Sequence, residues 1–231
     1  MMHLPSPLLV VAAHPDDEAL GCGGTMAKAA AAGVSVHTLF FTNGVGARDA
    51  RNGTDTPSLA DERASAAHRA LRRLGAGHCD LLDFPDNRLD TVALLDLAQQ
   101  VEAVVERVRP AMILTHHADD LNVDHRCVHE AVMTACRPQP GHEVQQILCF
   151  EVASSTEWRA PRAATAFVPQ LFVDISAHLT DKLAALQEYE AEMRPWPHAR
   201  SIEALGHLAR WRGATVGVEA AEAFMVARMR L

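Results

Sequence analysis

Continuous hydrophobic runs alternate with amphipathic segments along the first 136 residues of the chain. The apolar runs predict buried strands, and the segments in which apolar residues recur every three or four positions predict helices. Strands that alternate with helices in this way are typical of a parallel sheet with right-handed crossovers and helices on both faces. We expect strands at 8–13, 34–42, 79–84 and 112–115 and helices at 25–32, 58–74, 90–108 and 126–136.

The pattern after residue 136 is less regular. Strands are expected at 146–152, 170–174 and 223–228, and helices at 176–192 and 201–212. No internal repeat, linker or low-complexity segment divides the sequence, and its length fits one large domain. The fold prediction is therefore one Rossmann-like α/β domain over residues 1–231, with a mostly parallel sheet, helices on both faces and a smaller, irregular C-terminal part.

Glycine and capping residues mark where the predicted elements begin and end. The run Gly21-Cys22-Gly23-Gly24 predicts a turn between the first strand and the first helix, and Gly33 predicts the end of that helix. Ser58 and Asp61 form a capping box for the second helix. The Gly/Asn/Asp-rich loop at 43–57 is longer than a simple connection requires, which favours a role at the lip of a site.

The composition is ordinary for a globular protein, with 48% hydrophobic and 22% charged residues. The net charge of −8 argues against a nucleic-acid-binding protein, which normally presents a basic face. No run approaches the roughly 18 consecutive apolar residues of a membrane span. Five cysteines, an odd number without a CxxC pair, favour reduced thiols over a disulfide framework, so we expect a cytoplasmic protein.

Residues 13–18 read Ala-His-Pro-Asp-Asp-Glu and directly follow the first predicted strand. Open α/β sheets bind ligands at the carboxyl ends of their strands, and a histidine with carboxylates there can hold a divalent metal. His14 and Asp17 are three residues apart on a strand-to-helix turn, so both side chains can point at one ion. The side chains of neighbouring Asp16 and Asp17 diverge, which leaves Asp16 free to act as a base on a water bound to the metal.

A second polar cluster follows the fourth predicted strand. It consists of His116, His117, Asp119, Asp120, Asp124 and His125. If the two strands are close in the sheet, this cluster supplies the remaining metal ligands. Two histidines and one carboxylate, with positions left for water, form a recognised ligand set for catalytic zinc.

These motifs together resemble those of the LmbE-like, or PIG-L, family of zinc-dependent N-deacetylases. The resemblance rests on residues 13–18 and on Asn122-Val123-Asp124-His125, and it covers most of the chain. Supporting matches are Thr42-Asn43-Gly44, Arg63 and Pro85-Asp86-Asn87-Arg88-Leu89. Enzymes of this family remove acetyl groups from N-acetylglucosaminyl substrates.

The resemblance implies a role for each matching residue. His14, Asp17 and His125 would hold one Zn2+ per chain, or another divalent metal, and Asp16 would be the general base. The implied reaction is removal of the acetyl group from an N-acetylated amino sugar or sugar conjugate, by attack of metal-activated water on the amide carbonyl. The implied partner is a small-molecule sugar substrate, with assembly into a homo-oligomer left open.

One position departs from the family pattern. Many members have a histidine where this chain has Asn122, and that histidine helps to stabilise the oxyanion or to protonate the leaving amine. Asparagine can donate a hydrogen bond but cannot carry a proton at pH 7. Either Asp16 makes both proton transfers, or His117 or His198 takes the role. The residues predicted to contact substrate are Arg63, Arg88, His117, Asn122 and His198.

Two other functions are compatible with the same residues. Clustered aspartates and histidines at sheet ends also serve metal-dependent phosphoesterases, and Asp119 and Asp120 keep that alternative open. A catalytically inactive, metal-containing carbohydrate-binding protein is the second alternative, which the Asn122 departure supports. The presence of Asp16 argues against it, because a binding protein needs no base beside its metal.

Overall fold

Seven strands form a mixed sheet in the computed structural model, which describes residues 4–46, 56–141, 143–160 and 164–230. Their order in the sheet is β3-β2-β1-β4-β5-β7-β6. Strands β1 to β5 run parallel, and β7 is antiparallel to both of its neighbours. The prediction of a mostly parallel, Rossmann-like sheet is confirmed. The strands are β1 (Leu8–Ala12), β2 (Val36–Thr42), β3 (His78–Phe84), β4 (Met112–His116), β5 (Gln146–Phe150), β6 (Leu171–Asp174) and β7 (Ala221–Met229).

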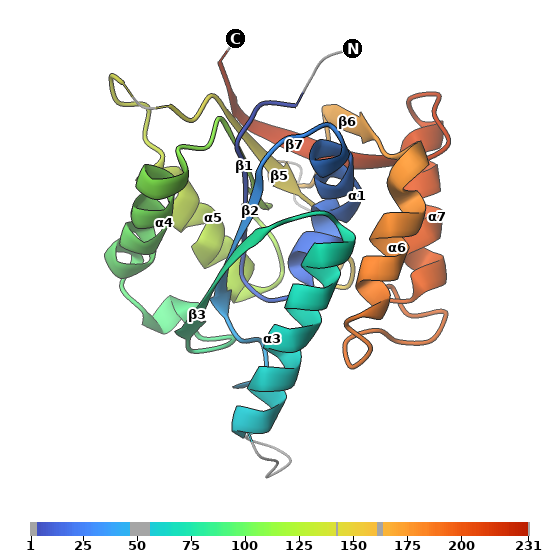
Figure 1. Cartoon of the computed structure of the whole chain (residues 1–231), viewed down its shortest axis with the longest axis horizontal. Coiled ribbons are helices and arrows are strands. Elements are labelled where there is room, and N and C mark those ends of the chain that lie inside the picture. Colours follow the sequence, from blue (N-terminus) through green and yellow to red (C-terminus); the bar gives the residue numbers. More distant parts are fainter. Residues whose placement is uncertain (1–3, 47–55, 142, 161–163, 231) are drawn as a thin grey trace.

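Helices cover both faces of the sheet, as Figure 1 shows. Helices α4 (Leu94–Val108) and α5 (Val123–Ala135) lie on one face. The other face carries α1 (Asp17–Ala31), α3 (Thr56–Arg73), α6 (Leu179–Gln187) and α7 (Ile202–Ala214). Each face has its own hydrophobic core, which explains why the central strand β1 is apolar at all five positions.

The strand order creates a crevice at the carboxyl ends of β1 and β4. The chain runs outward from β1 through β2 to β3, then returns to place β4 on the other side of β1. In the register of the two strands Leu8 pairs with Met112 and Val10 with Leu114, so both strands end at the same level. Ligands of open α/β sheets bind where the strand order reverses in this way. The polar segments that follow β1 and β4 meet at this point.

Helix α1 begins at Asp17, and the predicted turn over residues 21–24 is wrong. The glycines of this run serve close packing instead. A Cβ atom at Gly21 would lie 2.2 Å from Phe150 Cδ2, and one at Gly24 would lie 2.6 Å from Ile175 Cδ1. The helix therefore approaches the sheet more closely than any larger side chain allows. Its first turn, which carries Asp17, starts directly at the crevice.

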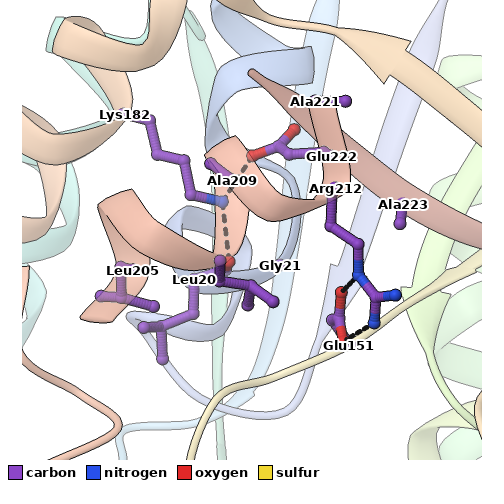
Figure 2. A pocket seen from close by; sticks show the side chains of 11 residues that line it. Leu20, Gly21, Glu151, Lys182, Leu205, Ala209, Arg212, Ala221, Glu222 and Ala223 are labelled. Atoms are coloured by element: carbon purple, nitrogen blue, oxygen red, sulfur yellow. Dashed lines mark hydrogen bonds and ion pairs between the residues drawn. The ribbon is translucent and has the colours of Figure 1, made fainter. Parts of the chain in front are cut away.

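A kink interrupts α1 at Cys22, whose φ of −145° is not helical. A buried ion pair from two other elements spans the kink (Figure 2). Lys182 Nζ donates to the carbonyl of Leu20 at 2.8 Å and lies 2.5 Å from Glu222 Oε1. The carboxylate of Glu222 accepts the backbone N–H groups of Gly24 at 2.9 Å and Thr25 at 2.7 Å. A cation thus meets the end of the first helical segment and an anion meets the start of the second, the arrangement that helix dipoles favour.

Several predicted boundaries shift. The helix expected at 90–108 is a 3-10 turn, Leu89–Thr91, followed by α4 from Leu94, because the chain is extended at Val92 and Ala93. The helix expected at 176–192 is a 3-10 turn, Ser176–His178, followed by α6, which ends at Gln187. Helix α3 begins at Thr56, before the predicted capping box, and most of the predicted 43–57 loop lies outside the described residues. Among the described helices, none is long and apolar enough to cross a membrane.

Candidate metal centre and catalytic base

Three buried side chains from the two polar segments converge in the crevice. His14 follows β1, Asp17 opens α1, and His125 lies in the first turn of α5. His14 Nδ1 lies 3.1 Å from Asp17 Oδ2, and His125 Nε2 lies 3.3 Å from the same oxygen. The structure thus brings together the three residues that the sequence predicts as metal ligands.

The donor atoms of this cluster fit a zinc ion. Ligands about 2.0–2.1 Å from a tetrahedral zinc stand roughly 3.3 Å apart, close to the spacings of these atoms. Asp17 Oδ1 and His125 Nε2 are buried and make no hydrogen bond with any residue that the structure describes. Unsatisfied buried polar atoms are rare and call for a missing partner. Two imidazoles and one carboxylate, with a coordination position left open, form a ligand set of catalytic zinc.

Carboxylates contact the other ring nitrogen of both histidines, on the side away from the cluster. His14 Nε2 lies 3.2 Å from Asp124 Oδ2 and 3.2 Å from Asp86 Oδ1. His125 Nδ1 lies 3.1 Å from an oxygen of Asp120. Carboxylates in this position fix the ring orientation and the tautomer of metal-binding histidines. This leaves Nδ1 of His14 and Nε2 of His125 as the nitrogens that face Asp17 and could hold a metal.

His14, Asp86 and Asp124 form a second group that could hold a metal. Its donors are already engaged, because the two oxygens of Asp124 accept the backbone N–H groups of Asn87 at 2.7 Å and Leu89 at 3.0 Å. The group would also take Nε2 of His14, the ring nitrogen opposite the one that lies beside Asp17. We therefore regard these carboxylates as supports for His14.

The surrounding charges keep Asp17 anionic, the form in which a carboxylate can bind a metal. Burial raises the pKa of Asp17, but the imidazoles of His125 and His116 outweigh it and hold that pKa well below its usual range. Burial lowers the pKa of His125, whereas Asp17 and Asp120 raise it, with a net value of about 9. A metal cation that binds here therefore displaces a proton from His125.

His116, at the end of β4, belongs to the site without acting as a ligand in this geometry. Its Nε2 accepts the backbone N–H of Ala13 at 2.9 Å, and its ring stacks on that of His125 with centroids 3.9 Å apart. Burial lowers the pKa of His116 well below the usual value, so the ring is neutral. His116 therefore ties the end of β1 to β4 and supports one face of the His125 ring.

Asp16 has an unusual backbone conformation, with φ 125° and ψ −30°. Such a conformation strains a residue other than glycine and persists only where surrounding contacts enforce it. Its backbone N–H donates to Glu18 Oε2 at 3.0 Å, and the hydroxyl of Tyr189 donates to Glu18 Oε1 at 2.6 Å. Glu18 thus holds the strained Asp16 peptide in place. In this conformation the side chains of Asp16 and Asp17 point in different directions.

Two guanidinium groups contact the carboxylate of Asp16. Arg200 Nη1 donates to Asp16 Oδ2 at 2.7 Å, and Arg63 Nη2 lies 3.6 Å from the same oxygen. Arg63 also forms an ion pair with the buried Glu192. Burial raises the pKa of Asp16, although both arginines oppose that shift. A buried carboxylate with a raised pKa suits a general base.

Three side chains around Asp16 are not predicted by the sequence. Arg200 contacts the Asp16 carboxylate, Glu192 pairs with Arg63, and Tyr189 donates to Glu18. All three lie in the irregular segment after α6, where no periodicity or spacing marks them. The one available signal was His198, selected from the same Pro/Trp-rich loop only two residues before Arg200. Nothing in the sequence links that loop to Asp16.

Three further residues predicted to contact substrate, Arg88, His117 and His198, make no contact with this cluster among the described residues. Arg88 is exposed, and no contact of its side chain with the cluster is found among the described residues. His117 Nε2 binds the backbone carbonyl of Thr165 at 2.9 Å and faces away toward Phe167. The ring of His198 packs against Trp158 with centroids 5.7 Å apart.

Asn122 caps helix α5. Its Oδ1 accepts the backbone N–H of Asp124, and its Nδ2 donates to Asn87 Oδ1 at 3.4 Å. The helix therefore begins at Val123, three residues earlier than predicted, and His125 falls in its first turn.

Comparison with known proteins places this arrangement among deacetylases. The family model of PIG-L, described as GlcNAc-PI de-N-acetylase, matches residues 9–136, which include the three ligand candidates and Asp16. The chain is 32% identical over 190 residues to the uncharacterized deacetylase YaiS of Escherichia coli, covering 80% of this chain and 90% of YaiS. It is 26% identical over 188 residues to a probable N-acetyl-α-D-glucosaminyl L-malate deacetylase of Bacillus cereus, covering 80% and 83% of the two chains.

A solved structure of another function shares the fold. The 4-carboxy-2-hydroxymuconate hydratase GalB of Pseudomonas putida superposes with a TM-score of 0.78 at 24% identity, covering 98% of each chain. The fold therefore accommodates more than one reaction. The match to more than half of the chain, together with the identity to YaiS, shows that the chain belongs to the PIG-L (LmbE-like) family, whose description names a de-N-acetylase.

Proposed function

We propose that this chain is a zinc-dependent hydrolase that removes the acetyl group from an N-acetylated amino sugar or sugar conjugate. The observation that carries the proposal is a buried carboxylate, Asp16, held beside the ligand cluster of His14, Asp17 and His125. A protein that only bound a sugar or a metal would need no base in this position. The substrate class is supported by the family description and by the sugar amide named for the Bacillus cereus relative.

The metal would polarise the amide carbonyl and lower the pKa of a bound water from that of bulk water to about 7. Asp16 then accepts a proton from the water as the new carbon–oxygen bond forms. The same residue returns this proton to the nitrogen as the carbon–nitrogen bond breaks. The immediate products are acetic acid and the free amine. The acid then gives its remaining proton to the amine to form acetate and an ammonium group, so atoms and charge balance with water as the only co-reactant.

Three contacts keep Asp16 ready for this role. Glu18 fixes its backbone, and Arg200 and Arg63 hold Oδ2. Oδ1 makes no hydrogen bond with any residue that the structure describes, so it is the oxygen open to a proton. Asp17, by contrast, is turned toward the imidazoles and serves the metal.

Amine and acetate release from N-acetylated substrates tests the proposal. The zinc-loaded protein is incubated with N-acetylglucosamine conjugates that differ in aglycone, and the free amine is measured with fluorescamine beside an enzymatic acetate assay. We expect equimolar amine and acetate from at least one conjugate. Asp16→Asn should lower turnover by roughly 100- to 10,000-fold, the usual contribution of a general base.

Two control measurements accompany this test. Asp61→Asn, a change of an exposed carboxylate on α3, should leave turnover unchanged, and the zinc content of Asp16→Asn should equal that of the parent. Zinc at one ion per chain without amine release across the panel would contradict the proposal and favour the binding-protein alternative. Phosphate release from phosphoesters would instead support the phosphoesterase alternative.

The hydratase that shares this fold calls for one further assay. Addition of water across a conjugated carbon–carbon double bond removes ultraviolet absorbance without releasing amine. Unsaturated dicarboxylic acids are therefore included in the panel. Loss of their absorbance, with no amine from any acetamide, would replace the deacetylase proposal by a hydratase.

A further inference from the structure

The proposed hydrolysis needs a donor for the oxyanion. Attack on the amide places negative charge on the former carbonyl oxygen, and enzymes meet that charge with donors aimed at the site in advance. The family resemblance provides a histidine for this purpose at the position of Asn122. In this structure the Asn122 amide serves its neighbours: Oδ1 accepts the backbone N–H of Asp124, and one N–H of Nδ2 donates to Asn87 Oδ1 at 3.4 Å.

Neither histidine that the sequence suggests as a substitute reaches the base. His117 binds the carbonyl of Thr165, and His198 Nδ1 accepts the backbone N–H of Arg200 at 3.0 Å. Among the described residues, no contact joins either imidazole to Asp16 or to the three ligand candidates. Both therefore act as structural groups in this geometry.

Arg200 has the position and the free donors that the histidines lack. Its Nη1 donates to Asp16 Oδ2 and its Nε donates to Ser154 Oγ, each at 2.7 Å. These two contacts lie on different sides of the guanidinium and fix its plane. Its Nη2 makes no hydrogen bond with any residue in the part of the chain that the structure describes.

Arg200 is more exposed to solvent than Arg63, the other arginine that contacts Asp16. The side chain of Arg200 is 18% exposed, whereas that of Arg63 is 8% exposed. Arg63 is also paired with Glu192 and stacks over the ring of Tyr189 at 5.8 Å. Arg63 is thus enclosed by protein, and Arg200 is the more accessible of the two guanidinium groups.

We propose that Arg200 is the catalytic residue that stabilises the oxyanion, through a hydrogen bond from Nη2 to the former carbonyl oxygen. The inference rests on the proposed function. A guanidinium keeps its proton at neutral pH, so Arg200 supplies charge but no proton. Under this proposal Asp16 makes both proton transfers, which is the first of the two alternatives that the sequence leaves open.

The kinetic test compares three variants of the full, zinc-loaded chain. Arg200→Met removes the charge and keeps the bulk, Arg200→Lys keeps the charge, and Arg210→Met changes an exposed arginine on α7 as the matched control. We expect Arg200→Met to lower kcat by roughly 100- to 1000-fold with a small change in KM, as removal of an oxyanion donor does elsewhere. Arg200→Lys should recover part of this loss, because a point charge replaces the planar fork.

Chemical rescue distinguishes a catalytic from a structural role. Arg200→Ala leaves a hole beside Asp16, and added methylguanidine should restore turnover in a saturable manner. A residue that merely stabilised the loop would give no such recovery. Unchanged zinc content and melting temperature in the Arg200 variants would show that the fold and the ligand cluster are intact.

Binding of methylphosphonate provides a readout that does not depend on turnover. This anion carries tetrahedral oxygens like those of the intermediate, and calorimetry measures its affinity for the zinc-loaded chain. We expect Arg200→Met to weaken binding by about 10-fold or more, because charge-assisted hydrogen bonds are the strong ones. Equal affinity for the parent and Arg200→Met would overturn the inference, even where amine release has already confirmed the proposed function. If Arg200→Met binds methylphosphonate more weakly but the parent releases no amine from any substrate, the anion site at Arg200 is supported and only the proposed deacetylase function is refuted.

Discussion

The side-chain oxygen of Asn122 accepts the backbone N–H of Asp124 at 2.8 Å and so begins helix α5. This hydrogen bond places His125 in the first turn of the helix, beside Asp17. Asparagine is among the best residues at this capping position. Asn122, the residue that departs from the family pattern, therefore has a structural role: it caps the helix that carries His125.

Asn122→Ser separates capping from catalysis. Serine caps a helix about as well as asparagine but lacks the amide donor. We expect turnover close to that of the parent, whereas loss of an oxyanion donor would cost roughly 100-fold or more. Asn122→Ala should lower the free energy of unfolding by about 1 kcal/mol, measured by urea denaturation. A large fall in kcat for Asn122→Ser would return the oxyanion role to Asn122.

Removal of a ligand candidate should abolish metal binding. Asp17→Asn and His125→Ala should each reduce bound zinc from about one ion per chain to near zero, because three protein ligands are the minimum of a catalytic site. Zinc should raise the melting temperature of the parent, since a ligand of the native state stabilises it, and should leave both variants unchanged. The control is His207→Ala, an exposed histidine on α7, which should bind zinc as the parent does.

Glu18 and Tyr189 should affect catalysis without affecting metal content. In Glu18→Gln the amide NH2 faces one of two donors, the backbone N–H of Asp16 or the hydroxyl of Tyr189. The strained Asp16 peptide, which stores about 1–3 kcal/mol, is then free to relax away from the metal. We expect kcat to fall by about 10-fold or more, since 1.36 kcal/mol is tenfold in rate. Tyr189→Phe, which leaves the Asp16 contact intact, should have a smaller effect; a normal kcat for Glu18→Gln would contradict this positioning role.

Lys182 and Glu222, the ion pair across the kink of α1, should contribute to the free energy of unfolding in a strongly non-additive way. Glu222→Gln leaves the buried charge of Lys182 uncompensated and should lower the free energy of unfolding by about 3–5 kcal/mol. Lys182→Met should cost less, because Glu222 keeps the two N–H groups of α1. The double variant should be more stable than the sum of the single changes predicts.

The exposed pair of Arg109 and Glu143 provides the control for that measurement. Exposed pairs contribute about 0–1 kcal/mol, so Arg109→Met should have little effect on urea denaturation. Equal losses for Arg109→Met and Glu222→Gln would show that the kink does not depend on the buried pair.

Local patterns in the sequence were enough to predict the sheet and the cluster in its crevice. Apolar runs mark buried parallel strands, and the polar residues that directly follow β1 and β4 meet because those strands are neighbours. The grouping of His14, Asp17 and His125 follows from this topology, although their role as ligands stays a proposal. The predicted role of Asp16 likewise follows from the divergence of adjacent side chains.

The errors arose where tertiary contacts decide local structure. The sequence predicts a turn at Gly21 and Gly24, but both residues stand inside α1. They are glycines because Phe150 and Ile175 leave no room for a side chain. Arg200 contacts Asp16 across a sequence separation of 184 residues, and no periodicity encodes such a contact. Side chains brought together by irregular loops are the part of a site that a single sequence does not reveal.

Some of the side chains around Asp16 come from a later stretch of the chain than the ligand candidates. The three ligand candidates lie within residues 9–136, whereas Tyr189, Glu192 and Arg200 follow α6. Under the proposed function, mutations in the later stretch should change proton transfer while zinc binding stays constant. A library confined to residues 188–201 would then search for new substrates and new pH optima while the ligand candidates stay unchanged.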